Sequence, residues 1–327
     1  MTEPLASLSQ ILSRTDTSLR EGRPVAATTW PTGFVPLDGQ LGGGLRVGEL
    51  VLLGGPQGLG KTTWTIQVAR NVVRAGGRVL YFSFEHEQLT FLERVLAQAA
   101  FEAEGLEAPT TRRIRDRFQR ASANGDAAGM PGLLHGLPGA EVALEELETF
   151  GQRFFVHESS GRTTTVASIR AELDGLPEGP APVVIVDYLQ KVAGHDEGAE
   201  VVEALKDLAL EKGVVVLAVV AADKVGLAPG HRLRVHELRG SSSLAYEPDV
   251  VLILNEKYDA VARHHLVYGV GAAERFREWV ILSIEKNRGG TDRIDLEFRK
   301  QFAHARFDPD GQLVAEQLTD ERVQVDV

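Results

Sequence analysis

The chain has 327 residues, of which 43% are hydrophobic, and this is enough for a substantial core in one large domain or two small ones. It contains no cysteine, which excludes disulfides, thiolate catalysis and cysteine-ligated zinc. The formal net charge of −11 argues against broad, nonspecific adhesion to nucleic acid, although it leaves room for a local basic channel.

No stretch approaches the roughly 18 unbroken apolar residues that a membrane-spanning helix needs. The first residues also lack the basic and apolar regions of a secretory signal. We therefore expect a cytoplasmic protein with no membrane contact.

Residues 1–29 are predicted to form an N-terminal helix and a linker. Apolar residues recur at roughly helical spacing between residues 4 and 20, namely Leu5, Leu8, Ile11, Leu12 and Leu19. A polar stretch follows them. The helix either folds onto its own domain or docks on a neighbouring subunit, because periodicity does not tell whose surface it covers.

Residues 30–307 are predicted to form one α/β domain, because strand and helix patterns alternate through most of it. Apolar runs predict buried strands at 49–54, 78–84, 182–187, 213–220 and 249–254. Helical patterns lie near 61–74, 87–104, 163–174 and 198–212. This alternation predicts a mostly parallel sheet with helices on both faces, which binds ligands at the carboxyl ends of its strands.

Three later segments depart from this alternation. Residues 105–150 combine an arginine cluster with a Gly-rich patch, and we interpret them as helices with a mobile surface loop and a solvated basic face. Trp279–Ile284, Arg293–Phe298 and His304–Phe307 have the pattern of short strands joined by turns, and we expect them to form a small antiparallel C-terminal extension. Residues 308–327 are expected to be a loose acidic tail.

The segment after the first apolar strand matches G-x-x-x-x-G-K-[ST], a pattern that binds nucleoside triphosphates. Its glycines let the backbone wrap a polyphosphate with N–H groups pointing inward, and the following helix places its N-terminus at the phosphates. Lys61 can reach the terminal phosphates, and the Thr62 hydroxyl can ligate Mg²⁺. The predicted nucleotide-binding residues are Gly55, Pro56, Gln57, Gly58, Leu59, Gly60, Lys61, Thr62 and Thr63.

Two further carboxylates complete the predicted site. Asp187 ends the apolar run that begins at Val183, where it would hold Mg²⁺ directly or through water. Glu85 follows the strand at 78–84, which we expect beside the phosphate-loop strand, and it is the predicted base that orients the attacking water. Glu87 is the alternative base, although an acid at that place also suits the start of a helix.

These residues resemble the C-terminal, RecA-like motor domain of DnaB-type replicative helicases. The resemblance covers about residues 30–307. It includes the lead-in to the phosphate loop, the Tyr81-Phe82-Ser83-Phe84-Glu85 run and, most specifically, Asp187-Tyr188-Leu189-Gln190. It implies a RecA-like P-loop NTPase core that uses ATP and Mg²⁺ and assembles as a homo-hexameric ring.

The resemblance also implies two sites that spacing alone does not indicate. Residues 238–242 match the place of a pore loop that grips single-stranded DNA, with Arg239, Gly240 and Ser242 as the contacts. Lys286 and Arg288 match a basic finger that reaches into the neighbouring subunit's nucleotide site and is catalytic there.

The sequence departs from the family pattern in three places. We expect no N-terminal collar domain, because only about 30 residues precede the motor. Ala221 stands where the family has a polar Gln sensor at the end of a strand. In the pore loop, Gly240 replaces an acid and Ser242 replaces a glycine.

Three functions follow from these residues. The first is an ATP-driven ring that translocates on or unwinds DNA. The second is a DnaB-like or KaiC-like ATPase that acts as an assembly motor or switch without helicase activity. The third is a nucleotide-binding scaffold that barely hydrolyses, and the presence of Glu85 argues against it.

Overall fold

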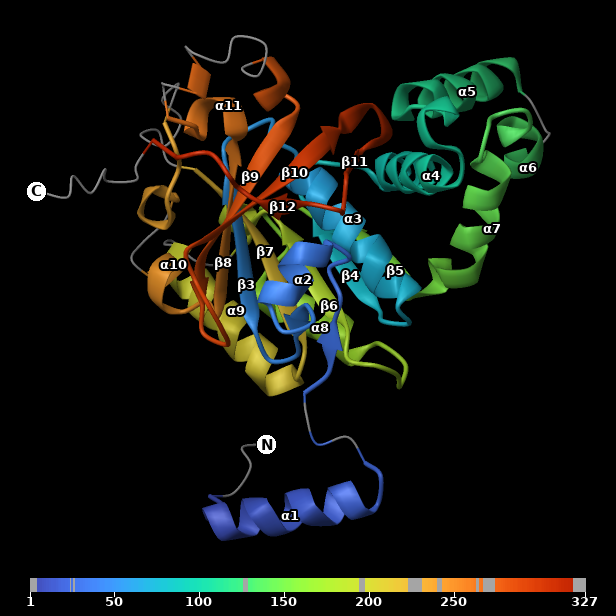
Figure 1. Ribbon diagram of the computed structural model, residues 1–327. Coiled ribbons are helices and arrows are strands. Elements are labelled where there is room, and N and C mark those ends of the chain that lie inside the picture. Colours follow the sequence, from blue (N-terminus) through green and yellow to red (C-terminus); the bar gives the residue numbers. More distant parts are fainter. Residues whose placement is uncertain are drawn as a thin grey trace, which may run out of the picture.

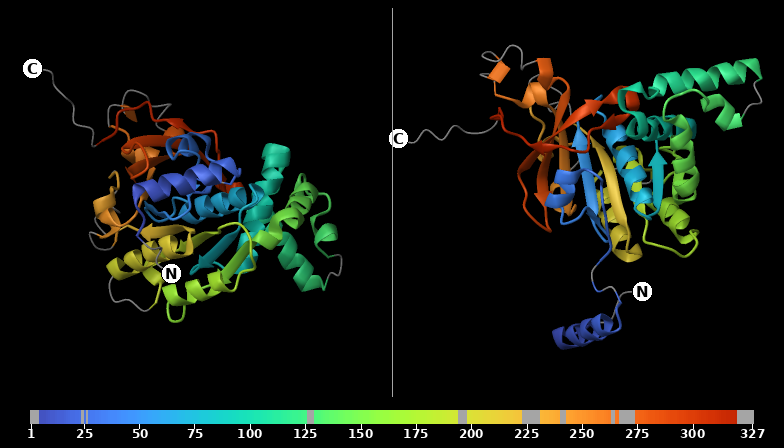
Figure 2. Two further views of the ribbon diagram at one scale, coloured as in Figure 1. Left: turned by 90° about the horizontal axis from the view of Figure 1, so that it is seen from below. Right: turned by 45° about the vertical axis from the view of Figure 1, so that its right-hand side comes forward.

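The computed structural model describes residues 5–319 except 24, 26, 126–128, 194–197, 223–230, 240–242, 263–264 and 267–273. Helix α1 (Leu8–Arg20) begins at the side-chain cap of Ser7 and has no buried residue. It stands apart from the sheet and its helices (Figure 1; Figure 2, right). Within one copy of the chain, its apolar residues therefore cover nothing. No helix among the described residues is long and apolar enough to cross a membrane.

Ten strands form one sheet in the order β11-β10-β9-β8-β3-β7-β6-β4-β5, with β12 paired to β10. The parallel part comprises β3 (Leu50–Gly55), β4 (Val79–Ser83), β5 (Phe154–Glu158), β6 (Val183–Asp187), β7 (Val215–Ala221) and β8 (Val250–Glu256). The antiparallel part comprises β9 (Trp279–Asn287), β10 (Ile294–Gln301), β11 (Arg306–Phe307) and β12 (Gln312–Leu313). This confirms the predicted fold class, a mostly parallel sheet with an antiparallel C-terminal extension.

The sheet is buried on both faces, which explains why its strands read as continuous apolar runs. On β3, Val51 and Leu53 face the core formed with α3 (Lys61–Arg74) and α4 (Gln88–Glu104). Leu50 and Leu52 face the opposite core, formed with α8 (Val166–Asp174) and α9 (Gly198–Lys212). Figure 1 shows the sheet between these helices.

Several short elements were not predicted, because they are too brief to show periodicity. The strands and helices are β1 (Thr29–Trp30), β2 (Leu45–Arg46), α2 (Val35–Gln40), α10 (Ser243–Tyr246) and α11 (Lys257–Ala260). The 3₁₀ turns are η1 (Gly105–Glu107), η2 (Gly151–Arg153), η3 (Leu189–Lys191), η5 (Val235–Glu237) and η6 (Phe302–His304). Of these, η3 and η6 matter for the site below.

The Gly-rich segment within 105–150 was expected to be a surface loop, and this is wrong for its central part. The segment contains α5 (Thr111–Asn124), α6 (Gly129–Leu134) and α7 (Ala140–Phe150). These helices share a small apolar core with α4, in which Ile114 and Leu134 are fully buried. They project beyond the sheet (Figure 2, right).

The expected loose tail is also wrong for its first part. Leu313 of β12 pairs with Leu296 of β10, and Leu318 is only 2% exposed. Two isolated apolar residues gave no periodic signal, although the sheet edge and a small core hold them. Residues 320–327 of the predicted tail lie outside the described part of the chain.

Candidate active site

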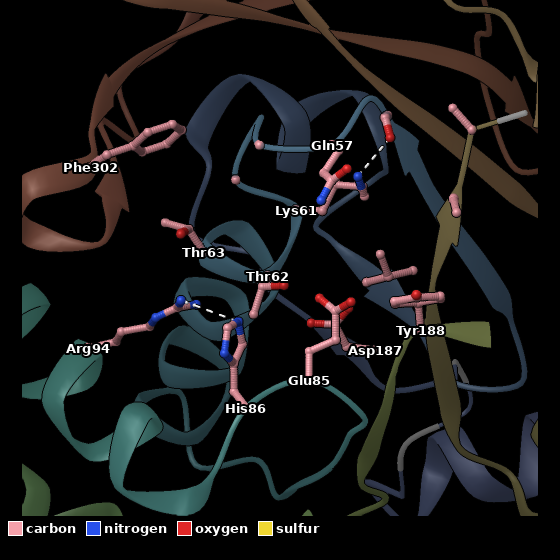
Figure 3. Close-up of a pocket in the computed structure, with 16 residues that line it drawn as sticks. Gln57, Lys61, Thr62, Thr63, Glu85, His86, Arg94, Asp187, Tyr188 and Phe302 are labelled. Atoms are coloured by element: carbon pink, nitrogen blue, oxygen red, sulfur yellow. Dashed lines mark hydrogen bonds between the residues drawn. The ribbon is translucent and has the colours of Figure 1, made fainter. Parts of the chain in front are cut away.

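A cavity of about 480 Å³ opens at the carboxyl ends of the parallel strands, where such sheets bind ligands. Figure 3 shows the side chains that converge there from the phosphate loop, α4, the end of β6 and η6. The lining residues are Gly55, Gln57, Gly58, Gly60, Lys61, Thr62, Thr63, Glu85, His86, Arg94, Asp187, Tyr188, Val219, Ala221, Ala222 and Phe302. Most of the predicted nucleotide-binding residues are therefore brought together.

The loop between β3 and α3 has the geometry of a phosphate cradle. Gly58 and Gly60 each have a φ of 84°, a left-handed conformation that favours glycine, and Gly60 is the N-cap of α3. The Lys61 ammonium donates to the carbonyls of Gly55 at 2.7 Å and Pro56 at 2.8 Å. Burial lowers the pKa of Lys61, although Asp187 and Glu85 oppose this. Phosphate oxygens near this ammonium would favour its charged form.

Asp187 ends β6 as a nearly buried carboxylate, with 2% exposure. The Tyr81 hydroxyl donates to its Oδ2 at 2.9 Å, and Thr62 also hydrogen-bonds to it. Burial raises the pKa of Asp187, whereas the bonds from Thr62 and Tyr81 lower it. A carboxylate beside a threonine hydroxyl offers the hard oxygen ligands that Mg²⁺ prefers, so these two residues fit the predicted metal site.

Glu85 lines the same cavity, although the reason predicted for its position is wrong. Its strand β4 is not beside β3, because β7 and β6 lie between them. The chain stays paired beyond β4, with the Phe84 N–H donating to the Asp187 carbonyl at 2.9 Å. This continued pairing carries Glu85 to the neighbourhood of Asp187 (Figure 3).

Two cavity residues on or before α4 were missed. Arg94 lies 3.3 Å from His86, measured from its Nη2 to the ring Nε2, and its buried Nη1 has no hydrogen-bond partner among the described residues. Burial lowers the pKa of His86, and the charge of Arg94 lowers it further. A neutral His86 with its proton on Nδ1 can accept the bond from Arg94. One arginine within an amphipathic helix gives no sequence signal for such a role.

Phe302 was missed for a similar reason. It comes from η6, far along the chain, and its ring packs edge-on against Phe307 with centroids 5.2 Å apart. A side chain at Gly60 would meet this ring at 2.7 Å, so the glycine allows the close approach. Phe302 is 39% exposed and lies at the end of the cavity away from Asp187 (Figure 3).

Lys286 and Arg288 do not line this cavity. Lys286 donates to the carbonyls of Ala245 at 2.9 Å and Tyr246 at 2.7 Å. Arg288 donates to the Tyr246 carbonyl and lies 3.4 Å from Asp249. Both side chains lie where β9 pairs with the first residues of β8, at the end of the parallel sheet opposite to the phosphate loop.

Of the predicted DNA contacts, only Arg239 can be placed. It is exposed, and its backbone N–H donates to the carbonyl of Ala221 at 2.9 Å. Gly240 and Ser242 lie outside the described residues.

A phosphate loop between a buried parallel strand and a helix, with a carboxylate at the end of a strand two places along the sheet, defines a P-loop NTPase of the RecA-like fold. The family model of the DnaB-like helicase C terminal domain matches residues 30–308. The chain belongs to this family and is an ATP-hydrolysing enzyme with the RecA-type motor fold.

Solved structures share this fold at low sequence identity. The structure of an isolated ATPase domain superposes with a TM-score of 0.69 at 20% identity, covering 93% of this chain and 99% of that chain. A structure described as that of a DnaB-like replicative helicase and its interactions with primase gives a TM-score of 0.66 at 20% identity, covering 93% of this chain and 67% of that chain.

Curated relatives match over shorter stretches. The DNA repair protein RadA of Campylobacter jejuni is 41% identical over 83 residues, which span 25% of this chain and 17% of RadA. Protein RecA of Clavibacter michiganensis is 46% identical over 67 residues, which span 20% of this chain and 18% of RecA. These matches cover less than a fifth of either relative.

Proposed function

We propose that this ATPase works as a homo-hexameric ring that couples ATP hydrolysis to translocation on, or unwinding of, DNA. The proposal combines the cavity described above with two groups that lie outside it, the finger residues and the segment that begins at Arg239. It also gives the exposed helix α1 a partner, since its apolar face would dock on the adjacent subunit of a ring.

Within one subunit, each cavity residue has a distinct task. Lys61 and the phosphate-loop N–H groups bind the phosphates of ATP, and α3 adds the favourable field of its N-terminus. Thr62 and Asp187 would hold Mg²⁺, which when bound neutralises phosphate charge. Glu85 orients the attacking water and accepts its proton, and Arg94 supplies a cation beside it.

The location of Lys286 and Arg288 is the observation that carries the ring. Asn287 pairs with Val250, the first residue of β8, whereas the phosphate loop follows Gly55, the last residue of β3. Six residues of strand separate the two ends, which is about 17 Å at 3.3 Å per residue. These side chains therefore serve a phosphate most readily in another copy of the chain, as arginine fingers supplied in trans do.

The segment that begins at Arg239 is the proposed DNA contact, with Arg239, Gly240 and Ser242 donating to phosphates of a single strand. Their number is small, which agrees with the net charge of −11. DNA binding confined to this segment should be weak outside the ring and should fade as salt rises.

The test is ATP turnover with and without single-stranded DNA over a range of salt concentrations, with Lys61→Ala as the inactive control. Stimulation that declines with salt is expected, because phosphate contacts release counterions. Turnover that is indifferent to DNA would instead support an assembly motor or switch, which the acidic charge and Ala221 favour. No turnover under any condition would contradict both functions.

A further inference from the structure

Gln190 connects the nucleotide cavity to the segment that begins at Arg239. It lies in the η3 turn, three residues after Asp187. Its Oε1 accepts from the backbone N–H of Ala221 at 3.2 Å, and its Nε2 donates to the Arg239 carbonyl at 2.8 Å. One amide thus joins three segments that are far apart in the sequence.

Two of these segments line the cavity. Asp187 and Tyr188 lead directly into η3, and Ala221 is the last residue of β7. The Arg239 N–H also donates to the Ala221 carbonyl at 2.9 Å, so the backbone of Arg239 is held at both its N–H and its carbonyl. A displacement of η3 or of the end of β7 would therefore be transmitted to Arg239.

The residue before Arg239 adds a contact with the phosphate-loop strand. Leu238 is 4% exposed, and a Cβ on Gly54 would lie only 2.5 Å from its Cδ2. Gly54 therefore allows the leucine to pack against the backbone just before the phosphate loop begins. The base of the segment touches β3 as well as β7 and η3.

Ala221 itself has no polar side chain with which to sense a phosphate or to bond the segment. A carboxamide can accept from one backbone group and donate to another at the same time, which an alanine, a carboxylate or an aliphatic side chain does not do. Gln190 has this chemistry, and its two bonds lie on either side of the junction between cavity and segment.

We propose that Gln190 is the positioning residue that couples the nucleotide state of the cavity to the segment beginning at Arg239. The inference rests on the proposed function for the role of that segment in binding DNA. The coupling itself, however, is a property of one chain and can be measured without DNA.

The test compares Gln190→Glu and Gln190→Ala with the wild-type protein. The glutamate keeps an oxygen for the Ala221 N–H but places a second oxygen against the Arg239 carbonyl, so it breaks only the link to the segment. Gln88→Glu is a matched control, because Gln88 donates a comparable bond to the Val156 carbonyl, away from Arg239. Melting temperatures establish that each variant is folded.

The first readout is hydrogen exchange of the peptide that contains Arg239, with and without Mg²⁺ and a non-hydrolysable ATP analogue. In the wild-type protein and the Gln88→Glu control we expect the nucleotide to slow exchange about fivefold, the effect of one hydrogen bond on a local opening equilibrium. Both Gln190 variants should lose this response. A response retained in Gln190→Glu, or absent from the wild-type protein, would overturn the coupling.

The second readout is the ratio of DNA-stimulated to basal ATP turnover. We expect this ratio to fall to about one in both Gln190 variants, while basal turnover stays within about threefold of wild type. Equal losses of basal and stimulated turnover would assign Gln190 a structural role and overturn the inference. If wild-type turnover is not stimulated at all, while hydrogen exchange still shows the coupling, then the proposed DNA function fails and the role of Gln190 stands.

Discussion

Tyr81→Phe tests whether the buried hydrogen-bond chain behind Asp187 controls metal affinity. The Tyr81 hydroxyl lies 2.9 Å from Asp187 Oδ2 and 2.7 Å from Thr65 Oγ1, and the tyrosine is fully buried. Phenylalanine keeps the ring and its edge-on contact with Phe91, at 4.6 Å between centroids. The substitution therefore removes one donor to a buried carboxylate and creates almost no cavity.

Two independent magnitudes agree for this loss. A hydrogen bond to a charged group contributes about 1.5–3 kcal/mol. Removing a partner that orients a metal ligand typically weakens metal binding by about 10–100-fold, which corresponds to about 1.4–2.7 kcal/mol. We therefore expect the Mg²⁺ concentration for half-maximal ATP turnover to rise about 10–100-fold in Tyr81→Phe.

The same change should alter the pH dependence in a definite direction. The Tyr81 bond lowers the pKa of Asp187 against the larger effect of burial, so its removal raises that pKa further. Protons then compete with Mg²⁺ at higher pH, and the acid limb of turnover at fixed Mg²⁺ should move to higher pH.

The assay is steady-state ATP turnover titrated with Mg²⁺ at several pH values, with Tyr246→Phe as the control. Tyr246 is 69% exposed, and its backbone carbonyl, which this substitution retains, makes the contacts with Lys286 and Arg288. An unchanged Mg²⁺ requirement in Tyr81→Phe would refute the reasoning, and so would an equal shift in the control.

Three further predictions concern the finger, the core and the metal ligand. Arg288→Ala should spare ATP binding but remove turnover by the assembled protein; retained turnover would exclude a role in trans. Arg70→Ala removes a fully buried guanidinium that pairs with Glu102 and Glu146. It should lower the free energy of unfolding by about 3 kcal/mol in chemical denaturation, the lower end for breaking a buried pair, because both carboxylates are partly exposed. Asp187→Asn should abolish turnover yet melt at a higher temperature than wild type at neutral pH without Mg²⁺ and nucleotide. Burial raises the folded-state pKa of Asp187, so its stabilising contribution exists at acid pH and is lost as pH rises through that pKa. The difference in melting temperature should accordingly vanish at acid pH, and a lower melting temperature for the variant at neutral pH would contradict this account.

The parts of the site that are local in sequence were predictable. The phosphate loop requires a strand, glycines and a helix in immediate succession, and Lys61 and Thr62 are placed by that succession alone. Asp187 likewise follows from an apolar strand with a carboxylate at its end. In both cases the chemistry and the backbone geometry lie within a few consecutive residues.

The parts that depend on the order of the strands were not predictable. Parallel strands buried on both faces have similar apolar composition, so nothing in their sequences places β7 and β6 between β3 and β4. Arg94, Phe302 and Gln190 enter or approach the site through this order and through packing of distant segments. Their roles become visible only when the distances are known.

The charges within the cavity explain why nucleotide binding should also stabilise the fold. Burial lowers the pKa of Lys61 and raises that of Asp187, and the Nη1 of Arg94 has no partner among the described residues. Each group is thus held in a place where the protein's own atoms solvate its charged form incompletely. ATP with Mg²⁺ supplies charges of the opposite sign, phosphate oxygens for the two cations and a divalent cation for the carboxylate. Because such a ligand binds the folded state, it should stabilise the protein by about 2.7 kcal/mol at one hundred times its dissociation constant. The gain should be lost in Lys61→Ala, since that variant no longer holds the phosphates. The groups that weaken the fold without ligand are therefore the ones that make it bind one.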